Sequence, residues 1–250
     1  MDMSGNTILV TGGTSGIGRA LAEAFHQGGN TVIVAWRRAA MLAEVAAANP
    51  GMVTAEFDVE HAAGIPGFVA RIVATHPGLN VLVNNAGIMR AEDVLAANFT
   101  LNDAEAMIAT NLLGPIRLTA ALLPQLRAQD KAAVLNVTSG LAFVPLAMTP
   151  TYSATKAALH SYSQSLRYQL RGTSVQVIEL APPAVATDLM PRSRENPNAL
   201  RLADFIAETM ALMAANPLAE EICVERVKLL RDAERKGSFA SVFTMINPVT

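Results

Sequence analysis

The chain has 250 residues, of which 51% are hydrophobic and 16% charged, and its formal net charge is −2. This length and apolar content suit one large domain whose core is covered on both sides. Since the charge is nearly balanced and no basic block stands out, nothing electrostatic favours nucleic acid or an anionic membrane surface, and we expect a small-molecule partner.

The cysteine content and the first residues bear on the compartment. Cys223 is the single cysteine, which excludes an internal disulfide and a cysteine-based zinc set. The 4 histidines have no ligand-like spacing, so we predict no catalytic metal. The start, MDMSGNTILVTGG, lacks a basic region followed by an apolar run, and no stretch approaches the roughly 18 apolar residues of a membrane span. We expect a cytoplasmic protein.

Short β-branched runs alternate with alanine- and leucine-rich helical patterns along the chain. The runs lie at 7–10, 31–35, 52–57, 80–83, 133–137 and 175–180. They are apolar on both faces, as expected of strands buried in a parallel sheet. The pattern predicts an α/β fold over residues 1–250: a single Rossmann-type doubly wound domain, with a parallel sheet of six to seven strands and helices on both faces.

The first strand leads directly into the turn TGGTSGIG, which carries Gly12, Gly16 and Gly18. Glycines suit this position because the backbone must turn tightly and approach a pyrophosphate held at a helix N-terminus. A glycine-rich turn alone can be an ordinary loop. Its place after the first strand of an alternating pattern favours a dinucleotide site.

The end of the second strand is where dinucleotide folds select their cofactor. An acidic residue there holds a ribose 2′-hydroxyl, whereas arginine accommodates a 2′-phosphate. This chain has Arg37 and Arg38 with no acid nearby, which favours NADP(H) over NAD(H), although the pair can also be solvated surface arginines. Asp58, just past the third strand, is positioned to meet an adenine amino group, and NNAG follows the fourth strand.

The segment 188–202 follows the sixth strand and has mixed polarity with two prolines, which suits a mobile segment over the substrate. Residues 203–235 look helical, and EICVERV is a weak candidate for a seventh strand. The tail FASVFTMINPVT has no clear assignment.

Four polar residues form a candidate catalytic set. Tyr152 and Lys156 are four positions apart on an expected helix, so they share one face, and the cation should lower the tyrosine pKa from about 10. Tyr152 is then a general acid or base. Ser139, at the end of the fifth strand, can bond a substrate oxygen, and Asn111, early in an expected helix, can hold a helix backbone group or a water. A Tyr-x-x-x-Lys pair alone could be a surface pair.

Taken together, TGGTSGIG, NNAG, Asn111, Ser139 and YSATK resemble the short-chain dehydrogenase/reductase family over nearly the whole chain. The resemblance implies that Tyr152 exchanges the substrate proton, Lys156 lowers its pKa and binds the nicotinamide ribose, and Ser139 orients the carbonyl. Asn111 would support a water-linked proton relay. The cofactor-binding residues implied are Gly12, Thr14, Ser15, Gly16, Ile17, Gly18, Arg37, Arg38, Asp58, Val59, Asn85, Ala86, Gly87, Tyr152, Lys156, Pro182, Val185 and Thr187.

Within the family, TSGLAF, ATKAALHS, LAPPAVATDL and ERVKLLRDA are similar to segments of one bacterial subgroup. The chain departs from the family where Pro182-Pro183-Ala184 replaces the usual Pro-Gly pair, so this turn lacks the freedom of glycine. The family commonly forms dimers and tetramers, which implies a homodimer or homotetramer here.

The substrate is expected to be an apolar ketone, aldehyde or secondary alcohol. The segment between Ser139 and Tyr152 contains Leu141, Phe143, Val144, Leu146 and Met148, and those nearest the two catalytic residues would give an apolar lining. Two alternatives are 3-oxoacyl thioester reduction by the same fold and a non-catalytic protein that senses NADP(H). The arginines of the 188–202 region could meet an anionic substrate, although solvated loop residues are the simpler interpretation: Arg192, Arg194 and Arg201.

Overall fold

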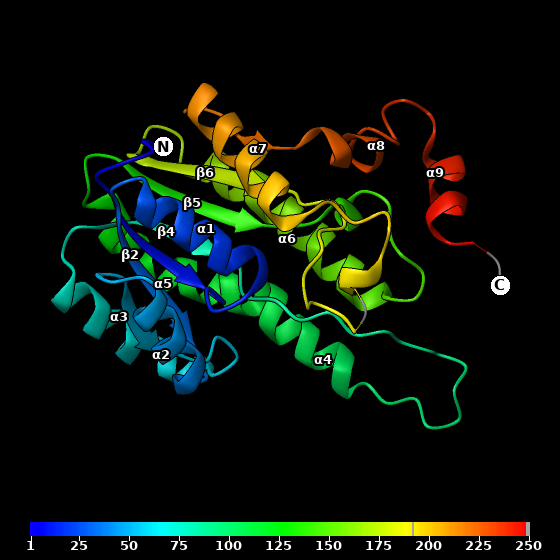
Figure 1. Ribbon diagram of the computed structural model, residues 1–250, viewed down its shortest axis with the longest axis horizontal. Coiled ribbons are helices and arrows are strands. Elements are labelled where there is room, and N and C mark those ends of the chain that lie inside the picture. Colours follow the sequence, from blue (N-terminus) through cyan, green and yellow to red (C-terminus); the bar gives the residue numbers. More distant parts are fainter. Residues whose placement is uncertain (192, 249–250) are drawn as a thin grey trace.

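The computed structural model describes residues 1–191 and 193–248, and it places the predicted strands in one parallel sheet (Figure 1). The order of the 7 strands is β3-β2-β1-β4-β5-β6-β7. They are β1 (Thr7–Thr11), β2 (Thr31–Trp36), β3 (Val53–Glu56), β4 (Leu79–Asn84), β5 (Ala132–Val137), β6 (Val175–Leu180) and β7 (Glu221–Ile222). Each neighbouring pair is parallel, and the order reverses between β1 and β4, so the predicted doubly wound fold is confirmed.

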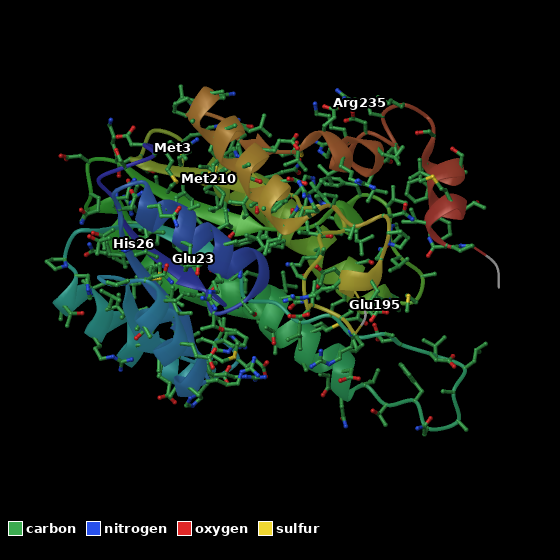
Figure 2. All side chains as sticks on the ribbon, in the orientation of Figure 1. Met3, Glu23, His26, Glu195, Met210 and Arg235 are labelled. Atoms are coloured by element: carbon green, nitrogen blue, oxygen red, sulfur yellow. The ribbon has the colours of Figure 1, made fainter. Side chains whose placement is uncertain are left out.

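Helices cover both faces of this sheet. They are α1 (Gly16–Gln27), α2 (Ala39–Ala48), α3 (Ile65–Thr75), α4 (Asn102–Ile108), α5 (Gly114–Arg127), α6 (Pro150–Gln169), α7 (Leu202–Ala215), α8 (Lys228–Arg231) and α9 (Phe239–Ile246). Successive strand residues point to opposite faces: Ile8 and Val10 join the core with α1, α2 and α7, whereas Leu9 joins the core with α3, α5 and α6. Met3 and Met210, labelled in Figure 2, pack against the first of these cores.

Helices α4 and α5 are joined by a π-helical turn at Ala109–Leu113, so the chain is helical from 102 to 127. In the part of the chain that the structure describes, Asn102–Arg127 is the one helix long and apolar enough to cross a membrane by length and composition. The expectation that no stretch approaches this length was therefore wrong. Here Leu118, Leu122 and Leu126 are fully buried against the sheet, as in the core helix of an α/β domain.

The C-terminal part is less helical than the sequence suggested. Helix α7 ends before Asn216-Pro217, because a residue that precedes proline is disfavoured in the α conformation. The chain then adds β7 to the edge of the sheet beside β6, so the weak seventh strand is present but short. The tail forms α9, whose Val242 packs against Val144.

The segment predicted to be mobile, 188–202, connects the end of β6 to α7 (Figure 1). Its end is fixed in the fold, since Leu200 pairs with Val185 in a parallel bridge and Leu202 is already the first residue of α7. Arg192 lies outside the described residues. Mobility of the rest of the segment stays a prediction.

Candidate active site

The glycine turn lies at the carboxyl end of β1, next to the point where the strand order reverses. Gly12 has φ +67°, and a Cβ there would lie 2.8 Å from the Ala86 Cα. A Cβ on Gly18 would lie 2.1 Å from the Asn85 Nδ2 and 2.4 Å from the Gly12 carbonyl oxygen. Only glycine fits these contacts, which bring the turn against NNAG.

Asn85, the residue after β4, holds the glycine turn in place. Its Nδ2 donates to the carbonyl oxygens of Thr11 (3.1 Å) and Gly12 (3.2 Å), and the Thr11 hydroxyl accepts from the backbone N–H of Asn85 and of Ala86. Asn85 thus uses its amide nitrogen to shape the turn, and its predicted contact with the cofactor stays a prediction. Thr11 is a site residue that the sequence analysis missed, although it opens the quoted TGGTSGIG.

The start of α1 is suited to an anion. Its first turn contains no acidic residue, and the side chain of its N-cap residue, Ser15, makes no capping hydrogen bond. The buried Thr14 hydroxyl finds no hydrogen-bond partner among the described residues. Unpaired N–H groups, a helix N-terminus and a buried hydroxyl without a partner together fit a dinucleotide pyrophosphate. Ile17 is partly buried and packs against the core, and its predicted contact with the cofactor stays a prediction.

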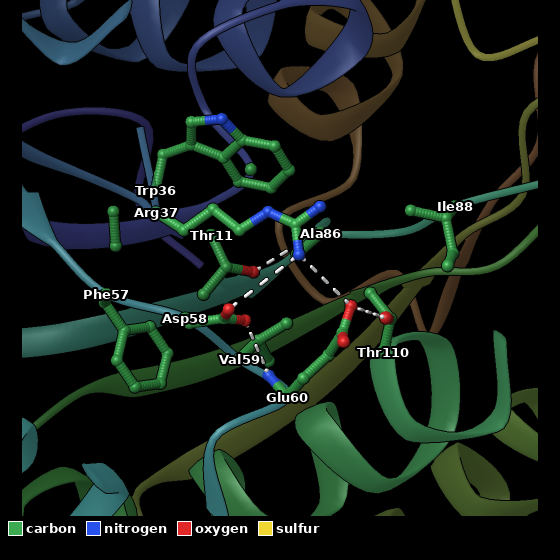
Figure 3. A pocket seen from close by; sticks show the side chains of 12 residues that line it. Thr11, Trp36, Arg37, Phe57, Asp58, Val59, Glu60, Ala86, Ile88 and Thr110 are labelled. Atoms are coloured by element: carbon green, nitrogen blue, oxygen red, sulfur yellow. Dashed lines mark hydrogen bonds and ion pairs between the residues drawn. The ribbon is translucent and has the colours of Figure 1, made fainter. Parts of the chain in front are cut away.

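Figure 3 shows the pocket at the ends of β2 and β3, where the adenosine half would lie. The Arg37 guanidinium is 3.8 Å from the Asp58 carboxylate and 3.6 Å from the Glu60 carboxylate. The prediction that no acid lies near Arg37 is wrong. Strand β3 lies beside β2, and the residues that follow β3 place two carboxylates next to Arg37. Arg38 lies over the Trp36 ring, with 5.5 Å from the guanidinium carbon to the ring centroid.

Glu60 is a second residue that the sequence analysis did not find. Its Oε1 accepts a 2.6 Å hydrogen bond from the Thr110 hydroxyl, which ties the β3 exit to the π turn (Figure 3). Asp58 Oδ1 in turn accepts from the Glu60 backbone N–H at 3.0 Å. Buried Val59 lies between the two acids and lines the same pocket, together with Ala86.

Asn111 lies in the π turn, well inside the long helix rather than early in it. The wider turn presents its fully buried amide to the loop after β4. Its Oδ1 accepts from the Ile88 backbone N–H and its Nδ2 donates to the Ile88 carbonyl, both at 2.9 Å. The backbone it holds is therefore that of a loop, not of a helix. A Cβ on Gly87 would lie 3.4 Å from the Asn111 Oδ1 and 3.7 Å from the Lys156 Nζ, so this loop lies directly over the lysine.

Tyr152 and Ser139 meet, as the sequence predicted. The buried phenol is hydrogen-bonded to the Ser139 side chain, whose Oγ also accepts from the Leu141 backbone N–H at 3.1 Å. Burial nevertheless raises the pKa of Tyr152 to about 12, and the bond with Ser139 opposes that rise only in part. The expected lowering of this pKa was wrong for the chain as it stands.

Lys156 explains that result. It does lie on the same face of α6 as Tyr152, but its Nζ is 5.6 Å from the ring centroid and donates a 2.8 Å hydrogen bond to the Val137 carbonyl. The lysine is 4% exposed, and burial lowers its pKa to about 8, a shift that the Glu179 carboxylate opposes. Lys156, rather than Tyr152, therefore titrates closer to neutral pH.

The predicted residues after β6 lie at three places: beside Ser139, in a bridge with Leu200, and against the glycine turn. Pro182 accepts a hydrogen bond from the Gly140 N–H at 2.8 Å, next to Ser139. Val185 is buried in its bridge with Leu200, and Thr187 packs on Gly16, where an added Cβ would lie 3.5 Å from the threonine methyl. The prediction that these residues bind the cofactor stays a prediction.

An apolar cluster lies beside the phenol. It consists of Met89, Met107 and Tyr152, with Ile88, Leu141, Leu146 and Met190 packed against them. Two of the five candidate lining residues, Leu141 and Leu146, thus face the site. Val144 belongs to the core with α9, and the Phe143 ring meets His160 edge-on.

The arginines of the 188–202 region are already paired where the structure describes them. Arg194 bonds to Asp188, and Arg201 bonds to Asp204. Glu92, which the sequence analysis missed, caps the start of α6: its carboxylate accepts from the backbone N–H and the hydroxyl of Thr151, both at 2.9 Å. A carboxylate at a helix N-terminus is favoured by the helix dipole, and here it fixes the turn that carries Tyr152.

Among the described residues, His160, Glu179 and Glu221 are the one His/Cys/Asp/Glu group close enough together to hold a metal ion. Each already has a protein partner. His160 Nδ1 is 2.7 Å from the Glu179 carboxylate, and Glu221 is 2.7 Å from Arg231. The geometry is that of paired side chains, so we do not assign a metal here.

Known proteins with similar sequences are oxidoreductases and dehydrogenases. A family model described as short chain dehydrogenase matches residues 6–198. The chain is 42% identical over 250 residues to an uncharacterized oxidoreductase, DltE, of Bacillus subtilis (strain 168), covering 99% of this chain and 98% of that protein. It is 35% identical over 176 residues to the NADP-dependent 3-hydroxy acid dehydrogenase YdfG of Salmonella typhi, covering 70% and 71%.

Solved structures show the same fold. A short chain dehydrogenase from Burkholderia cenocepacia J2315, crystallised with NADP, matches with a TM-score of 0.81 at 26% identity over 98% of this chain and 100% of the other. A short chain dehydrogenase/reductase from Burkholderia phymatum, crystallised with NAD, matches with a TM-score of 0.80 at 20% identity over 100% and 98%, and shows the fold alone.

Proposed function

Because this chain belongs to the short-chain dehydrogenase/reductase family and is an oxidoreductase, we propose that it transfers a hydride between NADP(H) and an apolar ketone, aldehyde or secondary alcohol. The observation that carries this proposal is the Tyr152 phenol hydrogen-bonded to Ser139, beside an apolar cluster and above a buried lysine. One small carbonyl compound could contact all of these groups at once.

The cofactor part of the proposal rests on residues that follow the carboxyl ends of β1 and β2. The start of α1 and the Thr14 hydroxyl would hold the pyrophosphate, and Arg37 with Arg38 would meet the 2′-phosphate. A nicotinamide bound in this fold supplies or accepts the hydride. NADP is named for the relative YdfG and for one solved structure, which supports the same choice here.

In the reduction direction, the protein's own task is to place and protonate the carbonyl oxygen. Ser139 donates a hydrogen bond that orients this oxygen, and Tyr152 delivers the proton. A pKa of about 12 keeps the phenol protonated near neutral pH, which suits a donor. Lys156, with a pKa of about 8, can exchange a proton with solvent in the physiological range, and Asn111 holds the loop that lies over it.

Two alternatives are less well supported. Reduction of a 3-oxoacyl thioester would need a place for the acyl carrier, but Arg194 and Arg201 are already paired with aspartates. A protein that only senses NADP(H) has no need for a phenol bonded to a serine in an apolar pocket. A panel of ketones, 3-hydroxy acids and acyl thioesters assayed with NADPH separates these functions.

The decisive variant is Tyr152→Phe, which removes the proton donor and keeps the ring. We expect it to bind NADPH normally in a fluorescence titration and to lose most of its turnover, since general acid catalysis contributes about 10²-fold or more. Tyr168→Phe, on the exposed part of the same helix, is the matched control and should keep full activity. An unchanged rate in Tyr152→Phe would remove this residue from the mechanism.

We also propose that the chain assembles as a homodimer or homotetramer. Exposed apolar side chains on the β4 to α4 connection support this, with Leu95 91% exposed and Val94 and Leu101 also exposed. Figure 1 shows this connection extending away from the body of the domain. Sedimentation velocity should give a dimer or tetramer, and a monomer at micromolar concentration would contradict the proposal.

We propose a cytosolic location, supported by the free Cys223, whose thiol is partly buried and has its pKa raised to about 12 by burial. Such a thiol is unreactive near neutral pH. Cell fractionation with antibody detection tests this location, and recovery in the membrane fraction would argue against it.

A further inference from the structure

An ionisable side chain is buried near the end of the apolar strand β6. Glu179 is 1% exposed and lies on the sheet face that α6 covers. Removing a carboxylate from water costs several kcal/mol unless hydrogen bonds and an opposite charge compensate. The reaction outlined above gives this residue no task, so its partners need an explanation.

Both carboxylate oxygens of Glu179 have partners that belong to the active-site framework. Oε1 accepts a 2.7 Å hydrogen bond from the Thr138 hydroxyl, and Oε2 is 2.7 Å from the His160 Nδ1. Thr138 stands between Val137, whose carbonyl binds the Lys156 Nζ, and Ser139, which bonds to the phenol. His160 is one helical turn after Lys156 on α6. The carboxylate thus binds Thr138, which follows the residue whose carbonyl holds the Lys156 Nζ, and His160, which comes four residues after Lys156 on α6.

A row of polar residues in register across the sheet leads to this position. Asn84 on β4 pairs with Asn136 on β5, which pairs with Glu179 on β6. The side chains of the first two are hydrogen-bonded at 2.8 Å, and Asn136 also donates to the Ser163 hydroxyl of α6 at 2.9 Å. The two asparagine amides are neutral and hydrogen-bonded to each other, so Glu179 is the one ionisable residue of this row.

The ionisable groups around Glu179 come from three elements. Lys156 and His160 face it from α6, Glu221 from β7 and Arg231 from α8, with the Cys223 thiol nearby. Arg231 is already paired with Glu221 at 2.7 Å. Lys156 is a buried cation, and the negative charge of Glu179 can balance its positive charge.

We propose that Glu179 is a positioning residue of the active site, which acts as the buried counter-ion of Lys156 and, through Thr138, fixes the end of β5 that carries Ser139. This rests on the proposed function only for the task of Lys156. Burial lowers the lysine pKa and Glu179 raises it, so loss of the carboxylate charge should lower it further. Less of the lysine would then be protonated at neutral pH.

The test is a titration of Lys156 that needs no turnover. The chain has four lysines, Lys131, Lys156, Lys228 and Lys236, so ¹³C-lysine labelling gives few Cε resonances to follow by NMR. Lys156→Met assigns the buried one, and the three others are internal references. In the wild-type chain we expect a midpoint of about 8 for Lys156.

Glu179→Gln keeps the shape and an acceptor for Thr138 but removes the charge. We expect its Lys156 midpoint to move to lower pH by about one pH unit, and the high-pH limb of carbonyl reduction to move with it. Glu179→Asp, which keeps the charge, should restore most of that change. Glu220→Gln, on the exposed neighbour of Glu221, is the control and should titrate like the wild type.

An unmoved Lys156 midpoint in folded Glu179→Gln overturns the proposal, as does an equal shift in Glu220→Gln. If Glu179→Gln does not fold, the wild-type chain still decides the question: the Glu179 Cδ resonance should shift with the midpoint of Lys156, and this step should vanish in Lys156→Met. Absence of that step refutes the coupling. Since these titrations are independent of activity, a failed substrate screen would leave their outcome unaffected.

Discussion

Asn111→Ala is the substitution that most directly tests how the π turn builds the site. The wild-type amide makes two 2.9 Å hydrogen bonds to the backbone of Ile88 and a longer one, 3.3 Å, to the Thr155 hydroxyl. Alanine removes all three and leaves the Ile88 N–H and carbonyl without their partner. The loop over Lys156 should then lose its attachment to the long helix.

The expected cost follows from those bonds. Two backbone hydrogen bonds at about 0.5–1.5 kcal/mol each amount to roughly 1–3 kcal/mol, and the better helix propensity of alanine returns about 0.5 kcal/mol. We therefore expect a loss of about 0.5–2.5 kcal/mol in the free energy of unfolding, measured by urea denaturation with unchanged m-value. Because the loop positions Gly87 over Lys156, kcat for carbonyl reduction should fall about tenfold or more.

Asn102→Ala is the matched control, since Asn102 is exposed at the start of α4. It should change stability by less than about 0.5 kcal/mol and leave kcat unchanged. If Asn111→Ala proves as stable and as active as Asn102→Ala, the attachment of the loop to the π turn contributes nothing, and the reasoning about Asn111 is refuted.

Two further outcomes are expected. Arg37→Asp should shift preference from NADPH toward NADH. Glu60→Gln frees Arg37 from one competing carboxylate and should tighten NADPH binding by about two- to fivefold, since a half-exposed ion pair contributes about 0.2–1 kcal/mol. Fluorescence titrations that give both variants wild-type NADPH affinity would contradict this. The rate of carbonyl reduction should fall as pH rises through about 8, because the protonated form of Lys156 is present below its lowered pKa and lost above it. A flat profile of kcat/KM from about pH 6 to about pH 10 would count against this role of Lys156.

The strand and helix pattern, the glycine turn and the pairing of Tyr152 with Lys156 on one helix face were all predictable, because each depends on neighbours in the chain. Apolar runs read as buried strands, and four-residue spacing puts Tyr152 and Lys156 on one helix face. Glu179 in VQVIEL was also a signal, because a carboxylate in a buried strand needs hydrogen-bond or charge partners. The sequence does not indicate which residues those partners are.

The amino-acid sequence by itself determined the fold, the family resemblance and the identity of the four catalytic candidates, since these are matters of local periodicity and residue order. Tertiary structure decided the electrostatics. It brought Asp58 and Glu60 close to Arg37. It directed the Lys156 ammonium to the Val137 carbonyl rather than to the phenol. It also placed Glu179 in contact with Thr138 and His160. The physical reason is that charge interactions and desolvation depend on distances and burial between residues far apart in the chain, which spacing along the sequence does not encode.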